Sequence, residues 1–236
     1  MTSGGPPIRA LISDFGGVLT TPLVEAFAVY HEHSGISAEE LGSAMAQAET
    51  AHGEHPLFEL EKGTITEDEF RDRLDRHLPG KRLGTFRDTY FEHLHPNEPM
   101  IALMRELRES GVRMGMLTNN VREWAPLWRA KLPDIDDIFE LVVDSAFVGM
   151  RKPDPEIYLL TVERMGGLEP QECVFLDDMA INCDAARALG MMAVRFETNE
   201  QSISEVRAAF APGVLAAGVS PKKMRHERFA REARHL

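Results

Sequence analysis

The sequence predicts an α/β protein, a Rossmann-like parallel sheet with a helical cap inserted after the first strand. Short apolar segments typical of strands alternate with helical patterns through most of the 236 residues. This is the order expected of βαβ units and of a sheet covered on both faces. The segment from residue 22 to residue 97 interrupts the alternation with amphipathic helical patterns alone. Polar residues follow directly after several strands, at the edge where open α/β sheets bind ligands.

The core is expected to have five strands with helices between them. The strands are expected at Ala10–Ser13, Val112–Leu117, Leu141–Val143, Cys173–Leu176 and Met192–Phe196. The helices are expected over Pro99–Ser110, from Pro155 onward and over Ala180–Leu189. The first helix places Ile101, Met104 and Leu107 at helical spacing and stops before Gly111. Such patterns predict helices that bury one face against the sheet.

The interrupting segment is expected to form a helical cap. Its candidate helices are Val24–His33, Ala38–His52, Thr66–His77 and Leu83–His93. Ser37 and Thr66 are each followed three residues later by an acidic residue, which is typical of a helix start. The expected domains are a core of residues 1–21 and 98–236, with a basic C-terminal tail at residues 213–236, and a cap of residues 22–97. A cap over the ligand-binding edge can exclude water and select a substrate.

The composition excludes several classes of protein. A net charge of −12 opposes general nucleic-acid binding, because most of the surface would repel a polyanion. The apolar segments are too short to cross a membrane, and the first residues lack the pattern of a signal peptide. Two cysteines, Cys173 and Cys183, are too few for a disulfide framework and are interpreted as small core residues. We therefore expect a cytoplasmic monomer or homodimer with no nucleic-acid or membrane partner.

Residues that can carry chemistry follow four of the expected elements. They are Asp14, then Thr118 and Asn119, then Lys152, and then the pair Asp177 and Asp178. An aspartate can attack phosphorus, and the transferred phosphoryl group needs donors and cations placed in advance. Asp14, Asp178 and a phosphate would repel one another unless a cation lay between them, and oxygen ligands favour magnesium. The sequence thus predicts phosphoryl transfer with Mg²⁺, in which Lys152 neutralises the phosphate.

These residues lie in four motifs that resemble those of the haloacid dehalogenase-like hydrolase superfamily. The matching segments are Asp14 to Thr20, Leu117-Thr118-Asn119, Lys152-Pro153 and Phe175-Leu176-Asp177-Asp178, in the family's order and over nearly the whole chain. Around Lys152 and Asp178 the chain is most similar to the N-terminal phosphatase domain of soluble epoxide hydrolases and its bacterial relatives. The resemblance implies a hydrolase, most simply a phosphatase, with a Rossmann-like core and a helical cap.

The resemblance also implies a role for each residue. Asp14 would be the nucleophile and a magnesium ligand, with the backbone carbonyl of Gly16 and the carboxylate of Asp178 as further ligands. Thr118, Asn119 and Lys152 would bind the phosphate, together with the backbone of Gly16 and Gly17. Asp177 would support the metal from behind the ligands, and a direct contact to it stays open.

Gly16 departs from the family's usual pattern. Most phosphatases of the superfamily have a second aspartate at this position, which protonates the leaving group and then activates water. General acid–base catalysis contributes about 100-fold to 10,000-fold, so a phosphatase without it should be slow on poor leaving groups. The backbone carbonyl that would bind magnesium is still present.

Three hypotheses follow from this departure. The first is a magnesium-dependent phosphatase that acts on a small phosphorylated metabolite without the usual acid. The second is another reaction of the same superfamily: dehalogenases need neither metal nor acid, and phosphonate-cleaving enzymes use a cap lysine, for which Lys62 and Lys81 are the candidates. The third is a phosphometabolite-binding protein without turnover. The acidic pair Asp177 and Asp178 favours the first, and the cap sequence does not identify the substrate.

Overall fold

The computed structural model describes residues 6–22, 29–32, 34–84 and 86–210. A parallel sheet forms its centre, in the order β3-β2-β1-β4-β5. The strands are β1 (Ala10–Ser13), β2 (Arg113–Thr118), β3 (Leu141–Asp144), β4 (Cys173–Asp177) and β5 (Met192–Arg195). The predicted Rossmann-like α/β fold is confirmed, and each expected strand is found with its ends shifted by one residue at most.

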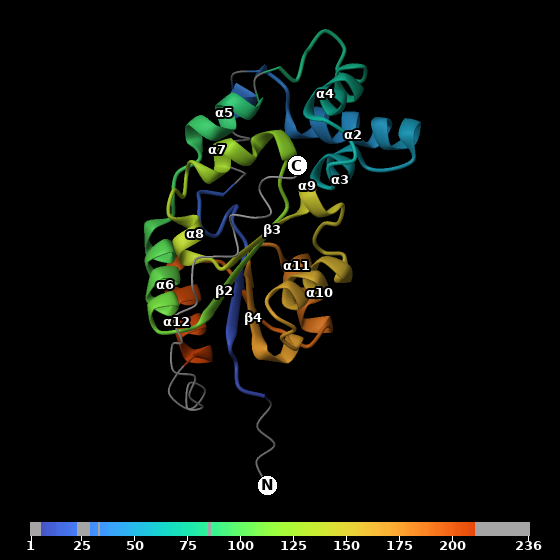
Figure 1. The fold of residues 1–236 in the computed structure, drawn as a ribbon. Coiled ribbons are helices and arrows are strands. Elements are labelled where there is room, and N and C mark those ends of the chain that lie inside the picture. The colour runs from blue at the N-terminus through green and yellow to red at the C-terminus, as the bar shows by residue number, and fades with distance from the viewer. Residues whose placement is uncertain (1–5, 23–28, 33, 85, 211–236) are drawn as a thin grey trace, which may run out of the picture.

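Helices cover both faces of this sheet (Figure 1), in line with the prediction. The core helices are α6 (Glu98–Glu109), α7 (Ala125–Arg129), α8 (Ile135–Ile138), α9 (Ser145–Val148), α10 (Pro155–Arg164), α11 (Ala180–Ala188) and α12 (Asn199–Ala209). Helices α6, α8 and α12 lie on one side, and α10 and α11 lie on the other. The expected helices correspond to α6, α10 and α11, whereas α12 was not predicted.

The strands alternate their side chains between two apolar cores. Leu11 packs with the side chains of α6 and α12, while Ala10 and Ile12 pack with those of α10. In β4, Val174 joins the first core and Phe175 the second. All of these side chains are fully buried. Burial on both faces is what makes these strands read as continuous apolar runs.

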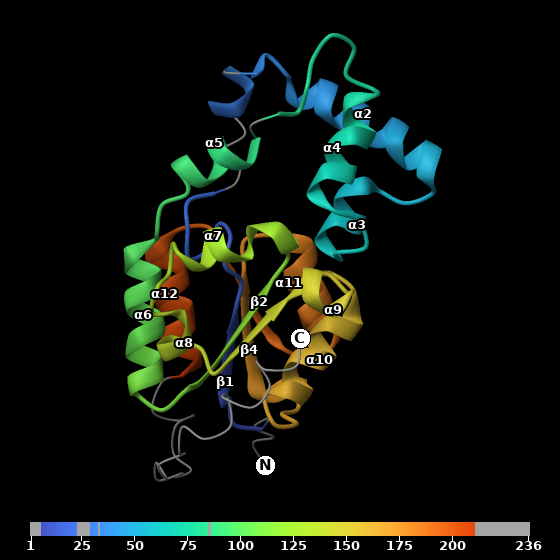
Figure 2. The same cartoon turned by 45° about the horizontal axis from the view of Figure 1, so that its top comes forward.

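The chain between β1 and β2 forms a helical insert (Figure 2). Its helices are α2 (Ala38–His52), α3 (Pro56–Glu61), α4 (Glu67–Asp75) and α5 (Phe86–His93). Ser37 and Thr66 are the N-caps of α2 and α4, and each forms a reciprocal pair of hydrogen bonds with the residue three positions on, Glu40 or Glu69. These capping boxes confirm the two predicted helix starts. Helix α3 was not predicted.

Two of the places at which the insert and the core meet position the insert over the sheet. Thr20 and Pro96 form an antiparallel bridge, so the two connecting segments run side by side. At the other place α3 packs on α9, where the Ser145 hydroxyl donates to the carbonyl oxygen of Glu61 at 2.5 Å. The insert therefore lies over the carboxyl ends of the strands. The predicted division into a core and a cap, at residues 22 and 97, agrees in position with this bridge but stays a prediction.

The remaining expectations concern the first cap helix, the C-terminal tail, the two cysteines and membrane-spanning segments. The expected first cap helix, Val24–His33, lies partly outside the described residues, and so does the whole basic tail at residues 213–236. Cys173 and Cys183 are buried and not bonded to each other, as interpreted from the sequence. Within the described part of the chain, no helix combines the length and the apolar character that crossing a membrane needs.

Candidate active site

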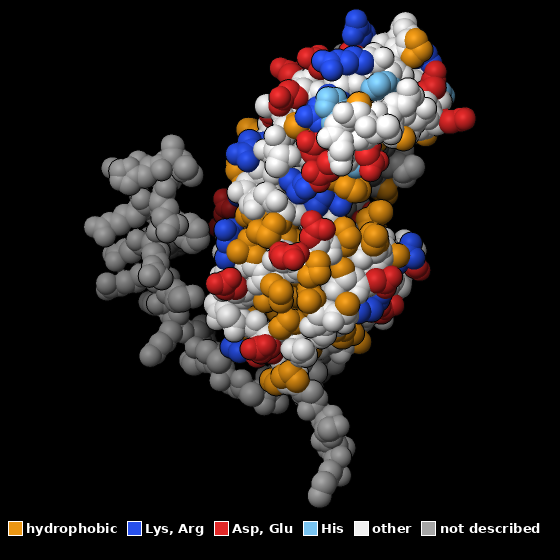
Figure 3. Space-filling view, turned by 90° about the vertical axis from the view of Figure 1, so that its right-hand side faces the viewer, with side chains coloured by type: hydrophobic (Ala, Val, Ile, Leu, Met, Phe, Trp, Pro, Cys, Tyr) orange, Lys and Arg blue, Asp and Glu red, His pale blue; other side chains and the backbone are white. Residues whose placement is uncertain are grey.

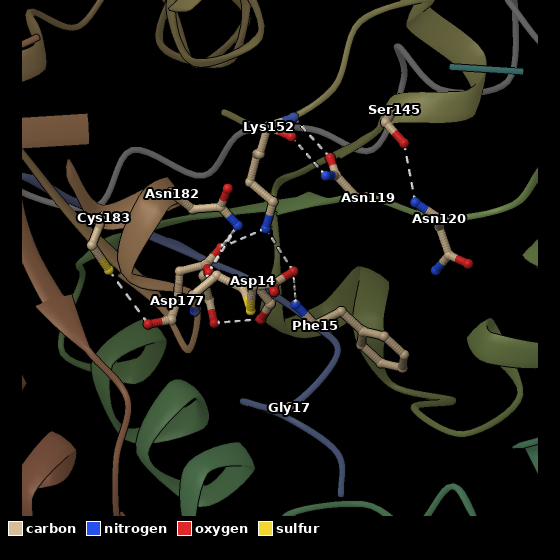
Figure 4. Close-up of polar contacts among 12 residues, drawn as sticks. Asp14, Phe15, Gly17, Asn119, Asn120, Ser145, Lys152, Asp177, Asn182 and Cys183 are labelled. Atoms are coloured by element: carbon tan, nitrogen blue, oxygen red, sulfur yellow. Dashed lines mark hydrogen bonds and ion pairs between the residues drawn. The ribbon is translucent and has the colours of Figure 1, made fainter. Parts of the chain in front are cut away.

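The sheet topology brings the predicted site residues together. β1 and β4 are neighbours, but the chain leaves them toward opposite halves of the sheet, which is the switch point where α/β folds bind ligands. Asp14 follows β1, and the acidic pair lies at the end of β4. Figure 4 shows Lys152 extending from its loop toward Asp14 and Asp177. Asp14, Gly16, Thr118, Asn119, Lys152 and Asp178 all line one cavity.

Lys152 is the electrostatic centre of the site. Its side chain is 1% exposed, and its Nζ lies 2.8 Å from Asp14 Oδ1 and 2.6 Å from Asp177 Oδ2. Burial on its own would lower the pKa of Lys152, but the neighbouring charges of Asp14 and Asp177 raise it above its ordinary value. Lys152 is therefore a permanent cation at the end of β1, and it fixes the orientation of the Asp14 carboxylate.

Asp177 is already saturated with hydrogen-bond donors. Its Oδ1 accepts from the backbone N–H of Met179 at 2.8 Å and from Asn182 Nδ2 at 3.0 Å. Its Oδ2 accepts from Lys152 Nζ and, at 3.2 Å, from Asn182 Nδ2. The residue is fully buried. These contacts suit a group that holds Lys152 in place better than a group that binds a ligand directly.

Asp14 and Asp178 present their carboxylates differently. Among the described residues, the Lys152 ammonium and the Phe15 backbone N–H both donate to Asp14 Oδ1, the latter at 2.7 Å. The Asp178 side chain is half-buried and lines the cavity. Burial raises the pKa of Asp14 to about 7, against the lowering effect of Lys152, and the pKa of Asp178 is also raised by burial and by Asp177. Crowded carboxylates raise one another's pKa unless a cation neutralises them.

The donor set of the site fits a magnesium ion. Asp14, Asp177 and Asp178 each offer a carboxylate oxygen within 4.8 Å of the others. Three carboxylates against the single ammonium of Lys152 leave two negative charges without a counter-charge. A hard divalent cation with oxygen ligands balances these charges. Asp14 and Asp178, which face the cavity, are the residues that could hold it.

Asn119 has a contact that the sequence did not predict. Its Oδ1 accepts from the Lys152 backbone N–H at 2.8 Å, and its Nδ2 donates to the Lys152 carbonyl oxygen at 2.9 Å. This reciprocal pair ties the Lys152 loop to the end of β2. The Asn119 side chain thus positions Lys152, while its predicted contact with phosphate stays a prediction. Thr118 is 1% exposed and ends β2, the strand that pairs with β1.

Gly16 and Gly17 have different surroundings. A Cβ at Gly16 would have no heavy atom within 4 Å, so the backbone there has room for a side chain. Gly17 has φ +76°, and a Cβ would lie 2.5 Å from Asp178 Oδ2. Only glycine fits this close approach without displacing the carboxylate. The loop after Asp14 therefore depends on Gly17 but not on Gly16 for its shape.

The cavity extends from these residues to the insert, with a volume of about 830 Å³. Most of its additional lining is apolar and comes from α2, α3 and α4 of the insert and from the core near α11. Arg151, the residue before Lys152, closes one side: its Nε donates to Glu61 Oε2 at 2.7 Å, and its guanidinium lies 4.0 Å from the centre of the Phe58 ring. Phe58 and Glu61 were not predicted as site residues, because α3 is too short to show a helical period. Arg151 was not predicted either, because its partner Glu61 lies 90 residues away in the sequence.

The two candidate cap lysines from the sequence, Lys62 and Lys81, lie at different places in the structure. Lys62 lines the cavity but is ion-paired with Glu54. Lys81 lies at a different groove and pairs with Glu40 at 2.5 Å. Trp128 is buried in the core, and Trp124 packs on the same core while also lining the cavity. The lysine that faces the strand ends is Lys152.

Comparisons with known proteins identify a matching family and several similar proteins. The family model described as haloacid dehalogenase-like hydrolase matches residues 8–190. The sesquiterpene phosphatase astK of Aspergillus oryzae is 31% identical over 84% of this chain and 95% of its own length. Acyl-CoA dehydrogenase family member 10 of Mus musculus is 29% identical over 87% of this chain, but the chain spans only 19% of that protein.

Solved structures agree with these sequence matches. A HAD family enzyme of Bacteroides thetaiotaomicron, in complex with magnesium and inorganic phosphate, is 27% identical with a TM-score of 0.59, over 80% of this chain and 94% of the other. The L-2-haloacid dehalogenase of Xanthobacter autotrophicus has a TM-score of 0.57 at 17% identity, over 85% of this chain and 83% of the other, a likeness of fold. Similarity therefore extends to enzymes of different chemistry on one fold.

Proposed function

This chain belongs to the haloacid dehalogenase-like hydrolase family, and from that premise we propose that it is a magnesium-dependent phosphatase acting on a small phosphorylated metabolite. The observation that carries the proposal is the group of three carboxylates around the single buried ammonium of Lys152. A site with this excess of negative charge attracts a divalent cation. With the cation bound, it can accept a phosphate dianion.

The proposed reaction proceeds through Asp14. Its carboxylate attacks phosphorus, the bond between phosphorus and the ester oxygen breaks, and the alcohol leaves with that electron pair and takes a proton from water. Water then attacks the phosphorus of the aspartyl phosphate, which releases inorganic phosphate and restores Asp14. Lys152 and the Phe15 backbone N–H hold Asp14 in position throughout.

The other residues would hold the phosphate and the metal. Thr118 and the backbone amides of the loop at Gly16 and Gly17 would donate to the phosphate oxygens. Asp14, Asp178 and the Gly16 carbonyl would hold magnesium, which supplies the positive charge that stabilises the transferring phosphoryl group. Asp177, whose oxygens already accept hydrogen bonds, would support the site through Lys152.

The names of the relatives support phosphate ester hydrolysis as a class. They include the sesquiterpene phosphatase and, at 31% identity over 52% of this chain, the glyceraldehyde 3-phosphate phosphatase of Methanopyrus kandleri. These names differ in substrate, so they support the reaction and not one substrate. The dehalogenase hypothesis is less well supported, because a metal-free reaction has no use for the Asp178 carboxylate as a metal ligand.

Phosphate release from a panel of phosphate monoesters, measured with Mg²⁺ and with a chelator, tests the proposal. We expect metal-dependent release that Asp14→Asn lowers at least 1000-fold without changing the circular dichroism spectrum. The matched control is Asp72→Asn, on the exposed face of α4, which should retain full activity. Full activity in Asp14→Asn, with deamidation excluded by mass spectrometry, overturns the assignment. Metal-independent halide release from haloacids supports the dehalogenase hypothesis instead.

A further inference from the structure

The cavity is much larger than a phosphate group requires. Its volume of about 830 Å³ is typical of pockets that enclose a drug-sized organic molecule. The predicted phosphate-binding residues all lie at the core end, where the strands terminate. The remaining space, between the insert and the core, is therefore available to the alcohol part of the substrate.

The lining of this remaining space is apolar. From the insert it includes Leu41, Met45, Leu57 and Phe70, and from the core Val121 and Ile181. These side chains come from segments far apart in the sequence, and the fold brings them to one chamber. We define the apolar chamber as this part of the cavity. Burial of apolar surface in such a chamber is the main source of affinity that it offers.

Exposed hydrophobic side chains gather at the chamber. Among the described residues seven large hydrophobic side chains are exposed, and three of them line this cavity: Phe58 at 39%, Met179 at 54% and Ile181 at 59%. Figure 3 shows hydrophobic side chains gathered on the core next to the insert, on the side of the molecule that lies at the right of Figure 1. Exposed apolar groups that are grouped at a cavity mark a binding surface for an apolar ligand.

The charged groups of the cavity argue against a second anionic site. Beyond Lys152, each described Lys or Arg of the lining pairs with a carboxylate. The pairs are Lys62 with Glu54, Arg71 with Asp68, Arg87 with Glu67, and Arg151 with Glu61. A second phosphate or a carboxylate on the substrate would lie against Glu54, Glu61 and Glu67, which line the cavity beside these cations and would repel it. The chamber is therefore suited to an uncharged group.

We propose that the substrate is the phosphate monoester of a neutral, apolar alcohol, with its hydrocarbon part in the apolar chamber. This assignment rests on the proposed phosphatase function, because it names the alcohol that the reaction at Asp14 releases. The apolar chamber would bury the hydrocarbon part of the alcohol away from water. The phosphate group would be the one charged group of the substrate that the site has to neutralise.

A series of n-alkyl phosphates from butyl to dodecyl, kept below their critical micelle concentrations, tests this assignment. We expect kcat/KM to rise about fourfold for each added methylene until the chamber is filled, which is the factor for burying one CH₂ group. Glycerol phosphate and fructose 1,6-bisphosphate, which are polar or doubly charged, should be poor substrates. Calorimetry with n-alkylphosphonates, which are not hydrolysed, measures the same chain-length effect on binding alone.

A matched pair of variants locates the effect. Ile181→Ser removes an exposed side chain of the chamber, and Leu159→Ser removes one that is 44% exposed on α10 and does not line the cavity. Both positions are exposed, so neither variant should disturb folding. We expect Ile181→Ser to lower kcat/KM for dodecyl phosphate about tenfold and for butyl phosphate by less than twofold. Leu159→Ser should leave both values unchanged.

The outcomes separate this inference from the proposed function. Metal-dependent hydrolysis that is equally fast for butyl, dodecyl and glycerol phosphates overturns the apolar chamber and leaves the phosphatase standing. An equal loss in Ile181→Ser and Leu159→Ser likewise overturns it. No phosphate release from any ester, with phosphonate binding that still rises with chain length, overturns the phosphatase and with it the assignment of the chamber to a leaving alcohol.

Discussion

Gly16, two residues after Asp14, offers the site no side chain that could donate or accept a proton. The backbone there has room for a Cβ, so the missing side chain is not enforced by crowding. In the proposed reaction, without a carboxyl group at this position, the leaving alcohol would take its proton from another source. Alcohols with a high pKa then leave slowly, whereas nitrophenolate leaves without help.

Gly16→Asp should therefore accelerate hydrolysis of alkyl phosphates by up to about 100-fold, the lower limit of typical acid–base contributions, and change p-nitrophenyl phosphate hydrolysis much less. Steady-state kcat for both esters measures this difference. The control is Gly16→Asn, which has the same shape but no carboxyl group. An equal gain in Gly16→Asn would contradict acid–base catalysis as the cause.

At the scale of elements, the contact of α3 with the core connects the insert to the Lys152 loop. Arg151 and Glu61 form an ion pair whose side chains are 15% and 16% exposed, and Ser145 donates to the Glu61 carbonyl. Burial raises the pKa of Glu61, and the charge of Arg151 opposes that shift. Arg151 directly precedes Lys152, so this ion pair connects α3 to the loop that carries the buried ammonium.

Arg151→Gln should weaken this contact, because it leaves the Glu61 carboxylate, whose pKa burial already raises, without a counter-charge. We expect a loss of about 1–3 kcal/mol in the free energy of unfolding, measured with urea, and faster hydrogen exchange in α3. The control is Glu106→Gln, whose ion pair with Arg207 is about half exposed and should contribute less than about 1 kcal/mol. Equal losses of unfolding free energy in the two variants would show that the α3 contact stabilises the fold no more than an exposed ion pair does.

The elements also show how far the sequence predicts this structure. Buried strands and long periodic helices such as α6 were predicted, because their patterns are set by the sheet they pack on. Helix α3 was missed, because its six residues span fewer than two turns. The strand-end residues were expected to meet, because parallel strands end at one edge. The reciprocal hydrogen bonds of Asn119 with Lys152, and the Arg151–Glu61 pair, join positions that no local pattern relates.

At the scale of the whole molecule, the three carboxylates of Asp14, Asp177 and Asp178 lie where the two halves of the sheet meet. Asp14 follows β1, the last strand of one half, and Asp178 follows β4, the first strand of the other. A cation held by both would connect the halves and remove their mutual repulsion. Binding that occurs only in the folded state raises its stability.

Magnesium should therefore raise the melting temperature of the wild-type protein. At 100 times the dissociation constant, the gain in unfolding free energy is about 2.7 kcal/mol. Asp178→Asn should lose most of this gain, and without metal it should be at least as stable as the wild type, because one of the crowded carboxylates is gone. Differential scanning calorimetry with and without Mg²⁺ measures both effects. Undiminished stabilisation of Asp178→Asn would exclude Asp178 as a ligand.

The position of β1 at the middle of the sheet also affects how the chain folds during translation. β1 is made early, yet its partners are β2 and β4, which follow it by more than a hundred residues: Ala10 pairs with Arg113 and with Cys173. Contacts of such high contact order form slowly. The helices of the insert have partners that are near in sequence, so they can fold before β2 and β4 have been synthesised. Until then β1 has no strand to pair with. During this time the apolar side chains of β1 are exposed, so β1 is a segment that a chaperone would bind.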